Sequence, residues 1–81
     1  FSANAPNTVW VSDITYIATR NGWLYLTVFL DLFSRMVVGW ALSSSLGSQM
    51  VQTALLRAIR NRRPGAGLII HSDRGVQYAC H

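Results

Sequence analysis

Two aspartates, Asp13 and Asp73, are the residues whose type and setting best suit chemistry. Asp13 interrupts a run of β-branched and aromatic residues, and Asp73 follows shortly after the apolar residues 68–70. An ionised carboxylate in an apolar strand is costly unless it is paired or binds a metal ion. In two parallel neighbouring strands the carboxylates would approach each other, and Mg²⁺ would relieve their repulsion because it prefers oxygen ligands. The alternative is that each aspartate caps a local turn or pairs with an arginine.

Asp31 is the third acidic residue and a weaker candidate for a metal ligand. A two-residue turn at 21–22 would pair Asp13 with Leu30. Because side chains alternate along a strand, this pairing puts Asp31 on the opposite face of the sheet. We therefore predict a structural role for Asp31, in which it holds the turn at 34–35.

Histidine and cysteine residues give a limited case for metal binding. His71 precedes Asp73 by two residues, so it points to the same face of a strand and borders the predicted site. We expect it to support the metal ligands or to pack beside them. Together with Cys80 and His81 it lacks the four-ligand spacing of structural zinc sites. The single cysteine cannot form an internal disulfide, which favours a reducing compartment.

The first half of the chain predicts three consecutive strands. The segment 9–17 is rich in β-branched and aromatic residues, and an Asn-Gly pair at 21–22 predicts a tight hairpin turn. The segment 23–32 is almost entirely apolar, as in a strand covered on both faces. A short turn at 33–35 leads to a third strand at 36–42. Together these segments predict a three-stranded antiparallel meander.

A helix and a fourth strand follow the meander. The apolar residues of 49–61 recur at spacings of three and four, which is typical of an amphipathic helix. Ser48 is the predicted N-cap, and the Arg-Arg-Pro-Gly sequence at 62–65 ends the helix. The segment 67–72 is the fourth strand. Periodicity by itself predicts an α/β domain. If the fourth strand returns through a right-handed crossover to lie beside the first and parallel to it, the sheet order is 3-2-1-4.

Five blocks of the sequence occur in a characteristic order. They are Trp10–Ile17, Gly22–Leu26, Asp31–Arg35, Val38–Trp40 and His71–Tyr78. Taken together, these blocks closely resemble bacterial insertion-sequence transposases of the orfB type, which carry a catalytic core like that of retroviral integrases. The resemblance implies a ribonuclease-H-like fold, here in part: the meander, the helix and the fourth strand parallel to the first.

The same resemblance implies a catalytic triad of two aspartates and one glutamate. Asp13 matches the first aspartate and Asp73 the second, so both are expected to bind metal, whereas the chain contains no glutamate. Because the sequence also begins at Phe1 without an initiator Met, we expect an excerpt from a longer protein. In this interpretation 1–8 is a linker and 9–81 is the N-terminal part of the catalytic core, truncated before the third acidic residue.

The activity implied by the resemblance is DNA transposition or integration by metal-dependent phosphoryl transfer, with cleavage at the transposon end followed by strand transfer. Two Mg²⁺ or Mn²⁺ ions are expected in the complete core, and no protein nucleophile is required. The implied partners are transposon-end and target DNA, the full-length protein is expected to be a homo-oligomer, and the location is the bacterial cytoplasm. The fragment is expected to be inactive alone. The alternative is a non-catalytic nucleic-acid-binding remnant of a mobile element.

Basic and polar residues near the predicted site suggest DNA contacts. The formal net charge of +4 favours a polyanionic partner. Arg74, Gln77 and Tyr78 follow the second aspartate, and the resemblance implies that they face the DNA. Arg62 and Arg63 form a basic cluster at the helix end, where a phosphate contact and a favourable interaction with the helix dipole are both open.

The aromatic residues are predicted to form the core. They are Trp10, Trp23, Tyr25, Phe29 and Trp40. A base-stacking platform would instead need them exposed on one face of the sheet. The apolar stretch 23–30 is shorter than the roughly 20 residues that a transmembrane helix requires, so no membrane partner is expected. The fourth strand would leave an exposed edge, which predicts association of the isolated chain.

Overall fold

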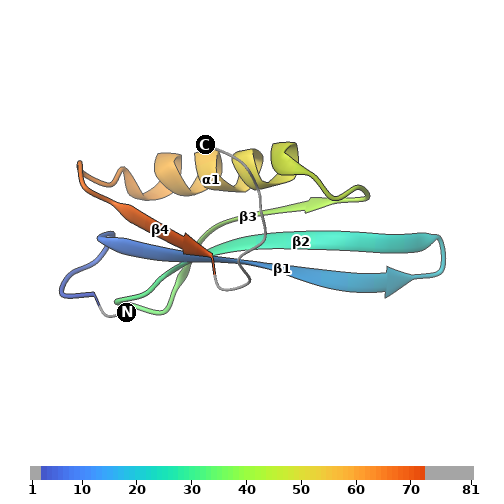
Figure 1. Cartoon of the computed structure of the whole chain (residues 1–81), viewed down its shortest axis with the longest axis horizontal. Helices are drawn as coiled ribbons and strands as arrows, with labels where there is room; N and C mark the ends of the chain where they lie inside the picture. Colours follow the sequence, from blue (N-terminus) through green and yellow to red (C-terminus); the bar gives the residue numbers. More distant parts are fainter. Residues whose placement is uncertain (1–2, 73–81) are drawn as a thin grey trace.

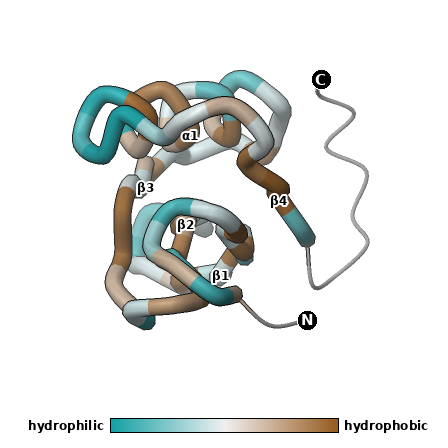
Figure 2. Tube along the Cα trace, turned by 90° about the vertical axis from the view of Figure 1, so that its left-hand side faces the viewer, coloured by the Kyte–Doolittle hydropathy of each residue, from teal (hydrophilic) through white to brown (hydrophobic). Residues whose placement is uncertain are grey.

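The computed structural model describes residues 3–72, which form a four-stranded sheet and one helix (Figure 1). The elements are β1 (Val9–Thr19), β2 (Gly22–Asp31), β3 (Val37–Ser43), α1 (Ser48–Arg62) and β4 (Ile69–Ser72). The strand order is β3-β2-β1-β4; β4 runs parallel to β1, and the other neighbours are antiparallel. Figure 2 shows α1 lying on one side of the strands. The predicted α/β class and the order 3-2-1-4 are therefore confirmed.

The β1–β2 hairpin turns one residue earlier than the sequence predicts. Gly22 already belongs to β2 and has a φ of 121°, a conformation that glycine adopts without steric cost. Asp13 consequently pairs with Val28, and the predicted pairing with Leu30 is wrong by two residues. An even displacement preserves the faces of a strand, so Asp31 still lies on the face opposite to Asp13, as predicted.

The core lies between the sheet and α1. Its buried members are Trp10, Ile14, Phe29, Val38 and Ala41 from the sheet and Met50, Val51, Ala54 and Ala58 from the helix. The four helical residues belong to the apolar face predicted from the sequence. Leu55 packs against this cluster, whereas Ile59 is 40% exposed. The periodicity therefore predicts the buried face correctly, except that it also includes the exposed residue Ile59.

A glycine in β3 allows α1 to lie directly on the sheet. A Cβ atom at Gly39 would come within 2.6 Å of the Ala54 carbonyl oxygen and within 2.6 Å of the Ala58 amide nitrogen. Both alanines are fully buried. Small residues on both elements thus set the distance between helix and strand.

The two ends of α1 differ in how well the sequence predicts them. The N-cap is Gly47, which makes no side-chain cap, and Ser48 is already helical, so the predicted N-cap is wrong by one residue. At the other end Arg63 adopts the left-handed conformation (φ 48°) and its amide donates to the Ile59 carbonyl at 2.7 Å. Pro64 follows and lacks an amide proton, so the helix ends where predicted.

Two of the aromatic residues predicted to be in the core are exposed instead. Trp10 and Phe29 are buried and Tyr25 packs against the core, but Trp23 and Trp40 are 56% and 52% exposed. Trp40 pairs with Val28 on the sheet face opposite to α1, which no element within residues 3–72 covers. The expectation that the second strand is covered on both faces is therefore wrong for this part of the chain.

Across 3–72, no helix is both long and apolar enough to cross a bilayer.

Candidate active site

Asp13 lies near the middle of β1 with its side chain on the sheet face opposite to α1. Its neighbours Ser12 and Ile14 are 1% and 3% exposed and point toward the helix, so alternation directs Asp13 to the other side. The Asp13 carboxylate is half-buried, and one of its oxygens accepts a hydrogen bond from the Ile14 amide at 2.9 Å. The strand thus presents one carboxylate on an open face.

The surroundings of Asp13 on this face are largely apolar. Its cross-strand partner is Val28, and the diagonal neighbours on β2 are Leu26 and Leu30. The β2 side of Asp13 is therefore aliphatic. A carboxylate oxygen is the kind of ligand that a hard cation prefers.

The parallel pairing of β1 with β4 brings His71 to the same face. Val11 pairs with His71, and Val11 shares its face with Asp13 because the two are separated by one residue in β1. The His71 side chain is half-buried. The structure therefore places His71 beside the predicted site, because its partner Val11 lies two residues before Asp13 in β1.

Several predicted site residues lie outside the described residues. They are Asp73, Arg74, Gln77 and Tyr78, together with Cys80 and His81. Among residues 3–72, no group of three His, Cys, Asp or Glu side chains is placed to hold a metal ion. Of the two carboxylates in the part that the structure describes, Asp13 is the one on the sheet face opposite to α1.

Asp31 occupies a different position and has a different function. Its side chain is fully buried, and its carboxylate accepts hydrogen bonds from the amides of Asn7 (3.2 Å) and Phe33 (3.4 Å) and from the Ser34 hydroxyl (3.0 Å). The Asp31 backbone carbonyl also accepts from the Arg35 amide at 2.7 Å. These contacts confirm the predicted role of Asp31, which holds the turn between β2 and β3.

Arg62 completes this buried cluster. Its guanidinium lies 3.7 Å from the Asp31 carboxylate and donates to the Asn7 side-chain oxygen at 3.1 Å. Only 26% of the Arg62 side chain is exposed. Asp31, Asn7 and Arg62 thus join the segment before β1, the β2–β3 turn and the end of α1. This cluster was not predicted from the sequence; its local signals there are an aspartate at the end of an apolar strand and a cation in the last turn of a helix.

Arg63 is placed differently from its neighbour. It is exposed at the left-handed cap of α1, so its side chain faces solvent. Of the two arginines at the helix end that are predicted to contact DNA, Arg62 is occupied by internal contacts and Arg63 is accessible. The DNA contact itself stays a prediction for both.

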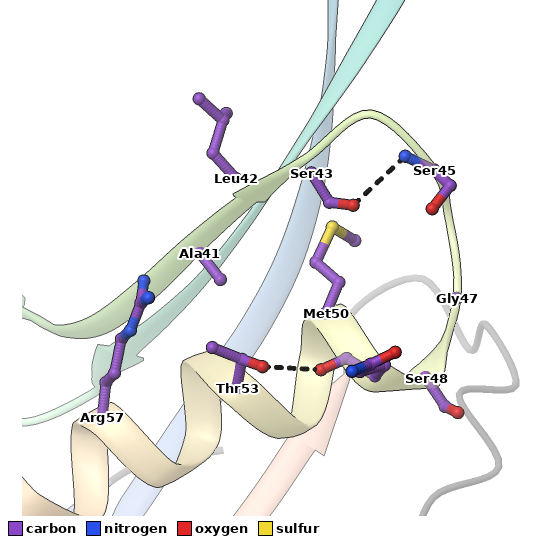
Figure 3. Close-up of a pocket in the computed structure, with 10 residues that line it drawn as sticks. Ala41, Leu42, Ser43, Ser45, Gly47, Ser48, Met50, Thr53 and Arg57 are labelled. Carbon is purple, nitrogen blue, oxygen red and sulfur yellow. Dashed lines mark hydrogen bonds between the residues drawn. The ribbon is translucent and has the colours of Figure 1, made fainter.

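A groove of about 520 Å³ lies between the end of β3 and the start of α1 (Figure 3). Its polar lining includes Ser43, Thr53 and Arg57. The Ser43 hydroxyl accepts from the Ser45 amide at 3.1 Å, the Thr53 hydroxyl donates to the Gln49 carbonyl at 3.0 Å, and Arg57 donates to the Trp40 carbonyl at 3.0 Å. The lining residues include no carboxylate, and the groove lies on the helix side of β3, away from Asp13. It therefore offers no support for metal chemistry.

Comparison with known proteins bears directly on this arrangement. The model of the integrase core domain matches residues 3–81, a range that includes Asp13 and Asp73. The chain belongs to the integrase core domain family. The resemblance to insertion-sequence transposases inferred from the sequence is thereby confirmed.

Individual transposases are similar along nearly the whole chain. The transposase for insertion sequence element IS904 of Lactococcus lactis is 49% identical over 78 residues, which cover 96% of this chain and 31% of that protein. Transposase InsF for insertion sequence IS3A of Escherichia coli is 46% identical over 78 residues, which cover 96% of this chain and 27% of that protein. The chain thus spans less than a third of the length of these curated relatives.

A solved structure supports the fold independently. The chain matches a chain in the structure of the simian T-cell lymphotropic virus intasome in complex with PP2A regulatory subunit B56 gamma, with a TM-score of 0.78 and 29% identity. The match covers 100% of this chain and 28% of that one. The sheet order and the helix of this chain therefore agree with the ribonuclease-H-like fold expected from the sequence.

Proposed function

We propose that this chain is the part of a DNA transposase that supplies both aspartates of a metal-dependent active site, Asp13 and Asp73. Transposase relatives that are 46–49% identical over almost the entire chain support the DNA-directed part of this proposal. The metal-dependent part rests on where β1 places Asp13.

The register between β1 and β4 is the observation that carries the proposal. Each β1 residue from Val9 to Ser12 pairs with the β4 residue 60 positions later in the sequence. Asp73 lies outside the described residues, but it is separated from Asp13 by the same 60 positions. In a parallel ladder, partners share a face of the sheet, so this separation supports a shared site for the two carboxylates.

Oxygen ligands on an open face fit Mg²⁺ or Mn²⁺, and Asp13 and Asp73 would hold the ions. When bound, two such ions activate the attacking oxygen and stabilise the leaving oxygen of the phosphodiester. The contribution of the protein is to fix the carboxylates on a rigid sheet. Asp31, on the opposite face, is not available for this task because Arg62 and three donors already occupy it.

The proposal assigns supporting roles to other residues. His71, which shares the Asp13 face, would border the metal ligands, and Arg74, Gln77 and Tyr78 would contact the DNA near the reacting phosphate. Arg63 is the accessible candidate for a further phosphate contact. The assignment of His71 follows from the pairing of β4 with β1, and those of Arg74, Gln77 and Tyr78 follow from the family resemblance.

The complete enzyme requires more than this chain provides. The sequence contains no glutamate, so the third acidic ligand would have to come from elsewhere in the protein. We therefore expect the chain alone to bind metal weakly and to catalyse no strand transfer. The proposed substrates are transposon-end and target DNA, acted on by a homo-oligomer of the full protein in the bacterial cytoplasm.

Calorimetric titration with Mn²⁺ tests the proposal. Wild-type chain should bind Mn²⁺, and Asp13→Asn and Asp73→Asn should each abolish binding while circular dichroism shows an unchanged fold. Asp31→Asn is the matched control, because it removes one carboxylate from the opposite face, and any folded fraction should still bind. Equal binding by Asp13→Asn and wild type would contradict a shared metal site and would favour the non-catalytic nucleic-acid-binding alternative.

A further inference from the structure

The end of the β1–β2 hairpin projects beyond α1 (Figure 1). The 11 residues of β1 span about 36 Å, whereas the 15 residues of α1 span about 22 Å. The helix therefore cannot cover the full length of the hairpin. Every residue from 15 to 23 is exposed, although the strands are still paired there.

Aromatic side chains gather on one face of this projecting end. Tyr16 pairs directly with Tyr25, and their rings meet edge to face with centroids 5.3 Å apart and an interplanar angle of 82°. Trp23 pairs with Ala18, the next position on the same face. Tyr16 is 54% exposed and Trp23 is 56% exposed. The result is a narrow aromatic face that continues the α1 side of the sheet past the end of the helix.

The chemistry of this face differs from that of the reverse side. The exposed aliphatic residue Ile17 and its partner Leu24 lie on the other face of the same hairpin. On the aromatic face of the projecting end, Ala18 is the one aliphatic residue. Tyrosine and tryptophan side chains suit protein interfaces as well as base stacking, so the charge beside the rings decides between these two kinds of partner.

A positive charge accompanies the rings. Arg20 lies in the hairpin turn and is exposed. The two acidic residues within 3–72 are both remote from it: Asp13 lies near mid-strand on the opposite face, and Asp31 is buried at the far end of β2. The hairpin end is therefore aromatic and cationic, which complements a chain of phosphates carrying unstacked bases.

We propose that this aromatic face, formed by Tyr16, Trp23 and Tyr25 with Arg20 beside it, binds single-stranded DNA. Bases stack on aromatic rings without regard to sequence, and an arginine holds the neighbouring phosphate. A duplex keeps its base faces stacked on one another and offers them no such contact. Single-stranded DNA is one form of the substrate proposed above, so this binding rests on the proposed function.

Binding of a short fluorescein-labelled oligothymidylate tests the proposal, measured by anisotropy at low salt in the presence of a metal chelator. The 81-residue chain should bind the single strand more tightly than a duplex of equal length. Trp23→Ala should weaken binding about 5- to 100-fold, the range expected for loss of one base-stacking ring. Trp40→Ala is the matched control, since Trp40 is 52% exposed but lies on the opposite face, and its affinity should stay within about twofold.

Two further variants keep the test decisive if Trp23→Ala does not fold. Arg20→Ala, in the exposed turn, should weaken binding and flatten its dependence on salt. In a Trp40→Phe variant the remaining exposed tryptophan is Trp23, since Trp10 is buried, so stacking should quench its fluorescence when the oligonucleotide is added. Absence of quenching together with unchanged affinity of Arg20→Ala would overturn the proposal.

Other outcomes would also overturn it. Unchanged affinity of a folded Trp23→Ala variant, equal losses in Trp23→Ala and Trp40→Ala, or equal affinity for duplex and single strand would each do so. Self-association that disappears in Trp23→Ala while DNA affinity is retained would assign the face to a protein partner. The anisotropy assay contains a chelator, so single-strand binding is measured without divalent metal. If the Mn²⁺ titration shows no binding while single-strand binding is intact, the proposed active site is contradicted and the aromatic face is not.

Discussion

Replacing Gly39 by alanine should separate α1 from the sheet. The added Cβ would lie 2.6 Å from the Ala54 carbonyl oxygen and 2.7 Å from the Ala58 Cβ, whereas ordinary contacts are 3.4–4 Å. The obstructing atoms belong to the helix backbone or to its shortest side chain, so no rotamer change relieves the overlap. The helix must move by about 1 Å, and overpacking of this kind costs about 1–3 kcal/mol.

This cost should be visible as a lower melting temperature. For a domain of this size, about 1 kcal/mol corresponds to roughly 4–8 °C, so Gly39→Ala should lower the Tm by roughly 5–20 °C. Thermal melts followed by circular dichroism would measure it. Gly65→Ala is the control, since a Cβ there meets no atom within 4 Å, and its stability should change by about 0.5 kcal/mol or less.

A Tm for Gly39→Ala within the error of wild type would refute the close packing of α1 on β3. Equal losses in Gly39→Ala and Gly65→Ala would attribute the effect to glycine replacement in general.

The remaining predictions concern the buried cluster, the sheet edge and the state of the chain. Asp31→Asn should destabilise the fold by about 1–3 kcal/mol in denaturant titrations, because an amide cannot accept from all the donors around it. Arg62→Ala should destabilise the fold more than Arg60→Ala, because Arg62 contacts buried Asp31 whereas Arg60 is exposed. Asn61→Ala should cost about 1 kcal/mol and promote aggregation measured by light scattering, because Asn61 donates to the Val38 carbonyl on edge strand β3 at 3.0 Å. The isolated chain should associate in sedimentation experiments through the sheet face opposite to α1; a sharp monomeric melt would contradict this.

The predictability of the fold varies with the range of the interactions involved. Local signals were sufficient for the hairpin, the helix face and the end of α1, because Asn-Gly, the helical spacing and Arg-Pro-Gly act within a few residues. The same signals left the hairpin register wrong by two residues and the N-cap wrong by one. An Asn-Gly pair locates a turn, but the first pair that closes it depends on packing farther along both strands.

Exposure of Trp23 and Trp40 was beyond the reach of local sequence. It depends on the length of α1 relative to the hairpin and on which face α1 covers, and both are properties of the assembled sheet. The strand periodicity did place Asp13 and His71 on one face. It did not anticipate that Arg62 joins Asn7 and Asp31, since those contacts link segments far apart in the sequence.

The central claim is that the carboxylate of Asp13 forms a metal site on the face opposite to α1. Paramagnetic broadening by Mn²⁺ in amide NMR spectra locates such a site directly. We expect substoichiometric Mn²⁺ to broaden the amide signals of Asp13, Val28 and His71 first and to spare those of Asn7 and Arg62, which surround Asp31. Broadening centred on Asp31, or none near Asp13, would contradict the account.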